Sequence, residues 1–183
     1  MRLIISLSLL VIVAATGLAS AETGGRSLSK EPFHVAQSDA EKALDEVLRG
    51  NNQNRNMHYY LLGTPWYDAK KDTGYSRMFT KNFLQALAKA ESDLIKLEPG
   101  GKCVEGDLCG FDYDPIDCSQ EGSDDGYLYR TIEDDGHKAI ILCLWVGYDP
   151  DKAETFYKLI KVDDHWKLDG IDCRRIGTKF NMD

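Results

Sequence analysis

Two consecutive hairpin patterns in the second half of the chain limit the fold more than any other feature. Residues 127–133 and 138–147 have an extended pattern and are joined by a turn that contains Gly136, a residue that tolerates the positive φ of tight turns. Residues 154–162 and 166–173 form a second such pair. The segment KAIILCLWVG at 138–147 is apolar on both faces, as expected of a central strand. The pattern predicts an antiparallel sheet of about four strands.

Two helix patterns precede these strands. Ser38 can cap the first helix, because Glu41 can return a hydrogen bond to the cap amide, and Gly50 is expected to end it. Thr80 can cap the second helix, which should stop before Pro99. The apolar stripe of this second helix consists of Phe83, Leu87, Ala90, Leu94 and Leu97. Helices followed by a strand meander predict an α+β fold, with N-terminal helices packed on one side of a curved antiparallel sheet.

The first residues predict export. Arg2 is followed by an apolar run at 3–15 and by small residues that end at Ala21, which together have the three parts of a secretory signal peptide. We expect residues 1–21 to be removed by cleavage after Ala21. The product should be periplasmic or secreted, with no membrane-spanning segment left. A membrane anchor is the alternative, but a bilayer span needs about 20 apolar residues.

The composition is that of an acidic globular domain. With 22 Lys and Arg against 30 Asp and Glu, the formal charge is -8 and the isoelectric point is near 5.0, which argues against a nucleic-acid partner. The hydrophobic fraction of 43% is close to the average for a packed domain. Residues 22–37 lack periodicity and are expected to be a flexible N-terminal arm. Residues 38–183 are expected to form a single α+β domain.

Five cysteines follow the predicted signal peptide: Cys103, Cys109, Cys118, Cys143 and Cys173. Disulfides are expected in an oxidising compartment, and the spacing of these residues does not match the close pairs of a zinc site. The odd number leaves at least one cysteine without an intrachain partner. The sequence leaves the pairing open, with the local Cys103–Cys109 bond favoured. Cys143 lies in the most apolar strand and is expected to be a small buried core residue.

The acidic connection, residues 103–125, joins the second helix to the first strand and is rich in turn residues. Its candidate binding residues are Asp112, Asp114, Asp117 and Gln120. An EF-hand calcium loop is not matched, because its required Gly and Glu would fall on Asp117 and Ser123 when counted from Asp112. We expect no metal site. The carboxylates should instead accept hydrogen bonds from nearby backbone amides, and partner recognition is the alternative.

An aromatic group lies between the two helix patterns. Its members are Tyr59, Tyr60, Trp66 and Tyr67. These side chains can line a binding groove or dock a partner, because aromatic residues contribute much of the energy of interfaces. Packing in the core is the alternative. His58 is the histidine expected to lie nearest the interior, whereas His34, His137 and His165 fall in the arm or in turns.

A resemblance rests on the segments YSRMFTKNF, FDYDPIDCSQ and WKLDGIDC, the last of which closes the strand meander. The chain resembles a family of small exported bacterial proteins of unknown function, whose domain is similar to the cone-shaped fold of the nuclear-transport-factor-2-like and cystatin-like superfamily. The resemblance covers about residues 38–175, and its most specific part is 114–120, supported by Trp166, Asp169 and Ile171. It implies mainly a fold, because that superfamily includes enzymes, binding modules and inert scaffolds.

The candidate residues do not converge on a catalytic set. The sequence has no H-E-x-x-H, no G-x-S-x-G and no phosphate-binding Gly-rich loop, so we expect no catalytic residues and no cofactor. We expect a non-enzymatic binding or accessory protein of the bacterial cell envelope that binds another envelope or secreted protein. An immunity-type inhibitor of a periplasmic toxin is a sharper form of this hypothesis. The alternative is a small-molecule-binding or isomerase-like enzyme that uses the cone pocket, with His58 or an Asp as base.

Overall fold

The computed structural model describes residues 31–53, 57–62, 74–103, 110–149, 155–174 and 177–182. The predicted signal peptide, most of the predicted arm, Trp66, Tyr67 and Cys109 lie outside these residues. Of Tyr59 only the backbone is described, within a helix. Within the described ranges, no helix has the length and apolar character needed to cross a membrane.

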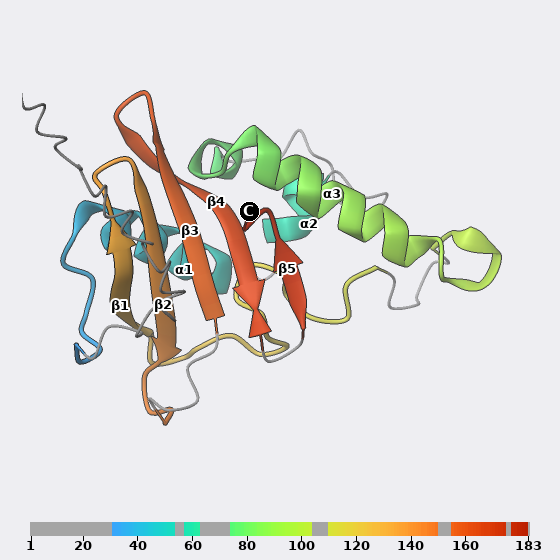
Figure 1. Ribbon diagram of the computed structural model, residues 1–183. Coiled ribbons are helices and arrows are strands. Elements are labelled where there is room, and N and C mark those ends of the chain that lie inside the picture. The colour runs from blue at the N-terminus through green and yellow to red at the C-terminus, as the bar shows by residue number, and fades with distance from the viewer. Residues whose placement is uncertain are drawn as a thin grey trace, which may run out of the picture.

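Five antiparallel strands form a single sheet in which neighbours in the chain are neighbours in space (Figure 1). The strands are β1 (Tyr127–Asp134), β2 (Lys138–Trp145), β3 (Thr155–Val162), β4 (His165–Cys173) and β5 (Thr178–Phe180). Both predicted hairpins are present, β1 with β2 and β3 with β4. The expected count of about four strands was too low, because β5 has only three residues and adds to the edge of β4.

The first helix is longer than its sequence signals indicate. Ser38 and Glu41 form the predicted capping box: the Glu41 amide donates to Ser38 Oγ at 3.1 Å, and the Ser38 amide donates to Glu41 Oε2 at 3.1 Å. Helix α1 spans Asp39–Gln53, so the expected end at Gly50 is wrong. A short helix, α2 (Met57–Leu62), follows, and it contains Tyr59 and Tyr60 of the predicted aromatic group.

The second predicted helix is α3, Lys81–Ile95, preceded by a 3₁₀ turn, η2 (Tyr75–Met78), and followed by another, η3 (Pro99–Gly101). Thr80 caps α3 as expected, because its Oγ1 accepts a hydrogen bond from the Phe83 amide at 3.1 Å. Phe83 and Leu87 are fully buried. Leu97, expected at the end of the apolar stripe, is 82% exposed because the helix ends before it.

The helices and the sheet share one hydrophobic core. In Figure 1, α1 passes behind the middle strands. Helix α3 runs beside β5, at the edge of the sheet opposite β1. Leu44 and Leu48 of α1 pack with Phe83 and Leu87 of α3 and with apolar side chains of all five strands. The fold is therefore α+β, with helices packed against an antiparallel sheet.

The described chain is attached to the sheet before α1 begins. His34 forms a backbone bridge with β1, in which the His34 amide donates to the Tyr129 carbonyl at 3.0 Å and the Tyr129 amide donates to the His34 carbonyl at 2.7 Å. Arg130 lies over the ring of Phe33, with its guanidinium carbon 4.1 Å from the ring centroid. The last part of the predicted arm is therefore part of the folded domain.

A buried polar cluster joins α3 to the far edge of the sheet. Lys158 Nζ of β3 lies 3.0 Å from Asp169 Oδ2 of β4, and Thr80 Oγ1 donates to Asp169 Oδ1 at 2.6 Å. Lys158 Nζ also donates to the Asn181 carbonyl at 2.7 Å, just after β5. Because the side chains of Lys158 and Asp169 are only 8% and 6% exposed, their charges need these partners.

Candidate functional site

The centre of the acidic connection is folded into tight turns by its own carboxylates. Asp114 Oδ1 accepts a hydrogen bond from the Ile116 amide at 2.8 Å, and Asp117 Oδ1 accepts from the Ser119 amide at 3.0 Å and from Ser119 Oγ at 2.8 Å. The Asp114 amide and the Ser119 carbonyl close the loop at 2.6 Å. These are the bonds from Asp to nearby amides that the sequence leads us to expect.

The helices hold this loop from one side. Asn51 Nδ2 of α1 donates to Asp114 Oδ2 at 2.9 Å, and Asn52 Nδ2 donates to the Ser123 carbonyl at 2.6 Å. Both donors belong to the last turn of α1, beyond the point where Gly50 was expected to end it. The extra turn of helix therefore positions the acidic connection.

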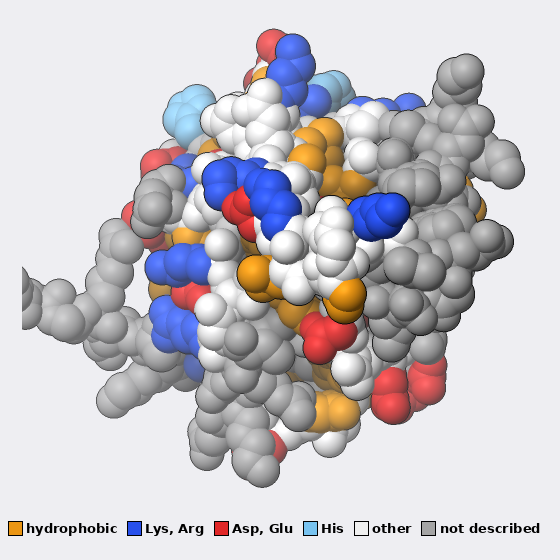
Figure 2. All heavy atoms as spheres, turned by 90° about the vertical axis from the view of Figure 1, so that its right-hand side faces the viewer, with side chains coloured by type: hydrophobic (Ala, Val, Ile, Leu, Met, Phe, Trp, Pro, Cys, Tyr) orange, Lys and Arg blue, Asp and Glu red, His pale blue; other side chains and the backbone are white. Residues whose placement is uncertain are grey.

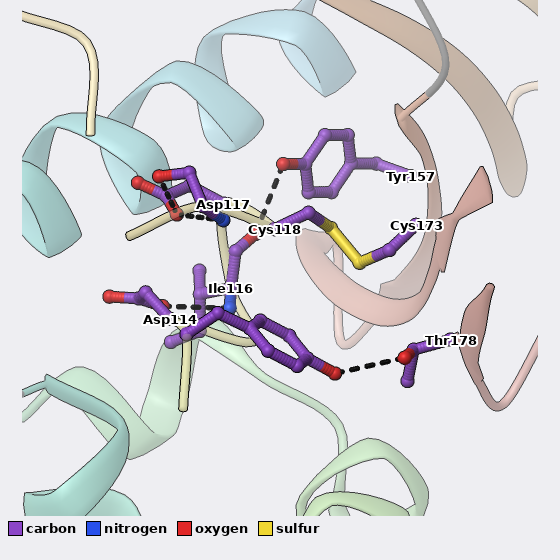
Figure 3. The surroundings of a disulfide bond; sticks show 9 residues. Asp114, Ile116, Asp117, Cys118, Tyr157, Cys173 and Thr178 are labelled. Atoms are coloured by element: carbon purple, nitrogen blue, oxygen red, sulfur yellow. Dashed lines mark hydrogen bonds between the residues drawn. A yellow bond between two sulfur atoms is a disulfide. The ribbon is translucent and has the colours of Figure 1, made fainter. Parts of the chain in front are cut away.

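The strands hold the loop from the other side, as Figure 3 shows. Tyr157 Oη of β3 donates to the Ile116 carbonyl at 3.0 Å, and Cys118 is joined by a disulfide to Cys173 of β4. Tyr113 Oη pairs with Thr178 Oγ1 of β5 at 3.0 Å. Residues 113–118 of the acidic connection are thus fixed to three strands as well as to α1.

The disulfide differs from the favoured local pairing, although both of its cysteines were candidates. Cys143 is a free thiol that is 5% exposed, which confirms the prediction of a buried core cysteine. Cys103 also takes part in a disulfide. Because Cys109 lies outside the described residues, the Cys103–Cys109 pairing stays a prediction.

A groove of about 340 Å³ opens between the acidic connection and the end of β2. It is lined by Asp112, Tyr113, Cys118, Ser119, Gln120, Glu121, Trp145 and Tyr148. The first six come from the acidic connection, and the last two come from the end of β2 and the turn that follows it. The two walls are held together where the Val146 amide donates to the Gly126 carbonyl at 3.0 Å.

One wall of the groove is aromatic. The rings of Trp145 and Tyr148 meet edge to face, with centroids 5.3 Å apart and planes at 71°. Trp145 is half-buried and packs against the core, whereas Tyr148 is 54% exposed. Val146, between them, is 36% exposed. This is the type of surface that contributes binding energy in protein interfaces.

The other wall is acidic and polar. Asp112, Gln120 and Glu121 are all exposed. Gln120 Nε2 of the side chain donates to the backbone carbonyl of Asp112 at 3.2 Å, which fixes the position of the Gln120 side chain. Within the described residues, neither Asp112 nor Glu121 takes part in an ion pair. These two carboxylates are therefore available to a ligand in the groove.

His58 and Asp114 form a separate pair in the interior. His58 Nδ1 lies 3.9 Å from Asp114 Oδ2, and the two side chains are 5% and 14% exposed. Burial lowers the pKa of His58 to about 4 and raises the pKa of Asp114 to about 6, so both groups are shifted toward their neutral forms. The His58 ring meets the buried ring of Phe111 edge to face, with centroids 6.5 Å apart, so the pair lies against the core.

The structure divides the predicted binding residues into two sets. Asp112 and Gln120 line the groove, whereas Asp114 and Asp117 point inward and hold the loop. Tyr60 lies half-buried in α2. Glu121, Trp145 and Tyr148 also line the groove but were not among the predicted binding residues, although Gly147, next to Tyr148, is a residue typical of an exposed turn after β2.

Other parts of the described surface are less distinctive. Figure 2 shows the face that carries α3 and β5, where the described basic, acidic and hydrophobic side chains are mixed in small groups. Within the described ranges, no group of three or more His, Cys, Asp or Glu side chains is placed to hold a metal ion. No protein-family model, curated protein or solved structure matches this chain. The groove is therefore interpreted from its own residues.

Proposed function

We propose that this protein is an exported, non-enzymatic binding or accessory protein of the bacterial cell envelope, and that it docks another protein at the groove. The observation that carries the proposal is the groove itself, which combines an exposed aromatic wall with two acidic side chains. Protein interfaces commonly have aromatic side chains at the centre, which contribute most of the binding energy, and charged or polar side chains at the rim.

The position of the groove on a fixed loop supports this function. A surface that is ordered before binding loses less conformational entropy when a partner arrives. The disulfide and the hydrogen bonds from Tyr157 and Asn51 supply that order. A disulfide of this kind is compatible with the oxidising compartments outside the cytoplasm, in agreement with the proposed export.

An inhibitor of the immunity type, acting on a periplasmic toxin, is the sharper form of the proposal. The chain carries a formal charge of -8, and an acidic binding surface accelerates association with a basic partner at low salt. We also propose that the α+β fold belongs with the cone-shaped nuclear-transport-factor-2-like and cystatin-like domains. The packing of helices against a single antiparallel sheet supports this, and that group includes binding modules.

Affinity capture from a cell-envelope extract tests the function. The oxidised chain from residue 22 onward is compared with Tyr148→Ala, which removes an exposed ring of the groove, and with Leu97→Ala. Leu97 is the matched control because it is also apolar and 82% exposed, and it follows α3 and does not line the groove. We expect one stoichiometric protein that is retained by wild type and by Leu97→Ala and lost with Tyr148→Ala.

Two results would contradict this function. A partner held equally by all three chains would place its binding surface elsewhere, and the absence of any stoichiometric partner would argue against a docking role. If the captured partner is a hydrolase, its activity should fall on binding, which would support the inhibitor form.

The enzymatic alternative has one observation in its favour, the buried Asp114 with a raised pKa beside His58. An acid–base catalyst needs such a group to face a substrate. Here Asp114 accepts hydrogen bonds from Asn51 and Ile116, and neither Asp114 nor His58 lines the groove. The groove is therefore the stronger candidate.

A further inference from the structure

We propose that the groove binds the guanidinium group of an arginine side chain presented by the protein partner. This inference rests on the proposed function and names the chemical group that the groove recognises. It is carried by the combination of an aromatic corner and two acidic side chains in one groove.

The aromatic corner offers ring faces to a cation. The electron-rich face of a Trp or Tyr ring attracts a positive group placed within about 6 Å of its centroid. Because the Trp145 and Tyr148 planes meet at 71°, a group that lies flat on one ring can contact the edge of the other. The 54% exposure of Tyr148 leaves part of its surface open to a partner.

The described charged residues of the groove have a single sign. Among its eight described lining residues, Asp112 and Glu121 are acidic and none is basic. A guanidinium group donates hydrogen bonds in a planar fork that matches a carboxylate, and the remaining donors can reach the Gln120 side-chain oxygen. An anionic ligand would instead be repelled by both carboxylates.

The groove is large enough to take one side chain. Its volume of about 340 Å³ lies at the lower end of the range of ligand pockets, roughly 300–1,000 Å³. Its floor includes Cys118, which is bonded to Cys173, and Tyr113, whose hydroxyl is fixed by Thr178. The groove therefore does not depend on rearrangement of this loop to accept one planar group.

Arginine is favoured over lysine by the geometry of stacking. A guanidinium is planar and weakly hydrated, so it lies flat on a ring, whereas an ammonium is a compact and strongly hydrated charge. This domain already uses that contact twice, with Arg130 over Phe33 at 4.1 Å and Arg174 over Phe156 at 4.0 Å. The groove offers the same kind of surface with no arginine of the described chain in it.

Titration with a matched pair of peptides tests the inference. The first probe is a blocked Gly-Ser-Arg-Ser-Gly peptide, and the second contains citrulline, which has nearly the shape of arginine but no charge. Binding is followed by the indole N–H signal of Trp145 in a ¹H–¹⁵N NMR spectrum, assigned with Trp145→Phe. We expect the arginine peptide to bind with a dissociation constant of about 1 mM, and the citrulline peptide to bind at least about tenfold more weakly.

Charge-matched variants locate the site. Glu121→Gln should weaken binding of the arginine peptide by about threefold to tenfold, because it removes one carboxylate from the groove. Asp39→Asn removes the same charge from the first turn of α1, where the side chain is 87% exposed, and should leave binding unchanged. Both positions are exposed, so thermal unfolding should confirm that the two variants fold like wild type.

A third probe, spermidine, distinguishes a groove that recognises an arginine side chain from one that recognises a free organic cation. Spermidine binding at Trp145 more tightly than the arginine peptide would overturn the assignment to a partner side chain. Equal binding of the arginine and citrulline peptides, or equal losses in Glu121→Gln and Asp39→Asn, would overturn the cation site.

These failures differ from failure of the proposed function. Capture of a partner that depends on Tyr148, without charge-dependent peptide binding, would retain the docking role and reject the arginine assignment. Charge-dependent peptide binding without a captured partner would support the cation site and reject the docking role.

Discussion

The carboxyl group of Asp114 is buried, and burial disfavours its charged form. Its pKa is raised to about 6, mainly by desolvation, so the folded state holds a proton that the unfolded chain releases near pH 4. The stability associated with this proton is present at low pH and is lost as the pH rises through about 6. Asp114→Asn removes this titration. We expect the stability of Asp114→Asn relative to wild type to increase by about 2 kcal/mol between pH 4 and pH 7.

The difference between the two chains is the informative measurement, because His58 titrates in the opposite sense. Burial lowers its pKa to about 4, so the stability associated with neutral His58 is lost as the pH falls from about 6.5. His58 is present in both chains, and the lost hydrogen bonds of Asp114→Asn give an offset that does not vary with pH. Urea unfolding at several pH values measures the difference. A difference that stays constant with pH would show that Asp114 titrates normally.

Two glycines illustrate how one methyl group has different effects in different elements. A Cβ on Gly170 of β4 would lie 2.4 Å from the Asn181 carbonyl oxygen and 2.8 Å from that of Phe180, so β5 would have to move. A Cβ on Gly50 of α1 would meet the flexible end of Met57 at 3.3 Å. We expect Gly170→Ala to lower the free energy of unfolding by about 1–3 kcal/mol. Gly50→Ala should be neutral or stabilise by up to about 1 kcal/mol through helix propensity. Thermal unfolding compares the two, and equal effects would contradict the close approach of β5 to β4.

The buried polar cluster at the start of α3 should contribute to the stability with which this helix is attached to the sheet. Asp169→Asn leaves Lys158 buried without its opposite charge, and breaking such a pair costs about 3–5 kcal/mol. The matched control is Asp93→Asn, which breaks exposed pairs with Lys89 and Lys96 on α3 and should change stability little. Chemical denaturation measures both. Similar midpoints for the two variants would show that the Lys158–Asp169 pair contributes little to the attachment of α3.

Prediction from the sequence succeeded for helix caps and hairpins, which depend on neighbouring residues. It failed for the end of α1 and for β5, which depend on contacts with residues distant in the chain. The capping box at Ser38, the Thr80 cap and both hairpins rest on neighbouring residues, and all are present. Gly50 is a poor helix residue, but the hydrogen bonds from Asn51 and Asn52 to the acidic connection support another turn of α1. Strand β5 was missed because three residues give too short a pattern, and its pairing depends on β4.

For the molecule as a whole, the candidate site was predicted in part. The sequence singled out Asp112 and Gln120 because they lie in a dense acidic segment, and both line the groove. No local pattern indicates that the turn after β2 meets this segment, because Trp145 and Gln120 are far apart in the chain. A backbone hydrogen bond from Val146 to Gly126 helps to bring them together. The aromatic wall of the groove therefore follows from tertiary structure and not from any local motif.

The Cys118–Cys173 disulfide connects stability and function across the molecule. It closes a segment of 55 residues that contains the first three strands, and the chain-entropy relation gives a loop of this size about 4 kcal/mol. Because Cys118 also lines the groove, loss of the bond should release the groove floor from β4. We expect Cys118→Ser with Cys173→Ser to lower the free energy of unfolding by about 2–4 kcal/mol and to weaken arginine-peptide binding even at temperatures where the domain stays folded. Cys143→Ala is the control, because that thiol is buried outside the groove and its loss leaves the disulfide intact. Calorimetry and the Trp145 NMR signal measure the two effects separately. If the double variant loses stability but binds the peptide like Cys143→Ala, the bond stabilises the fold without shaping the groove, and the hydrogen bonds from Tyr157 and Asn51 are sufficient to hold the acidic connection in place.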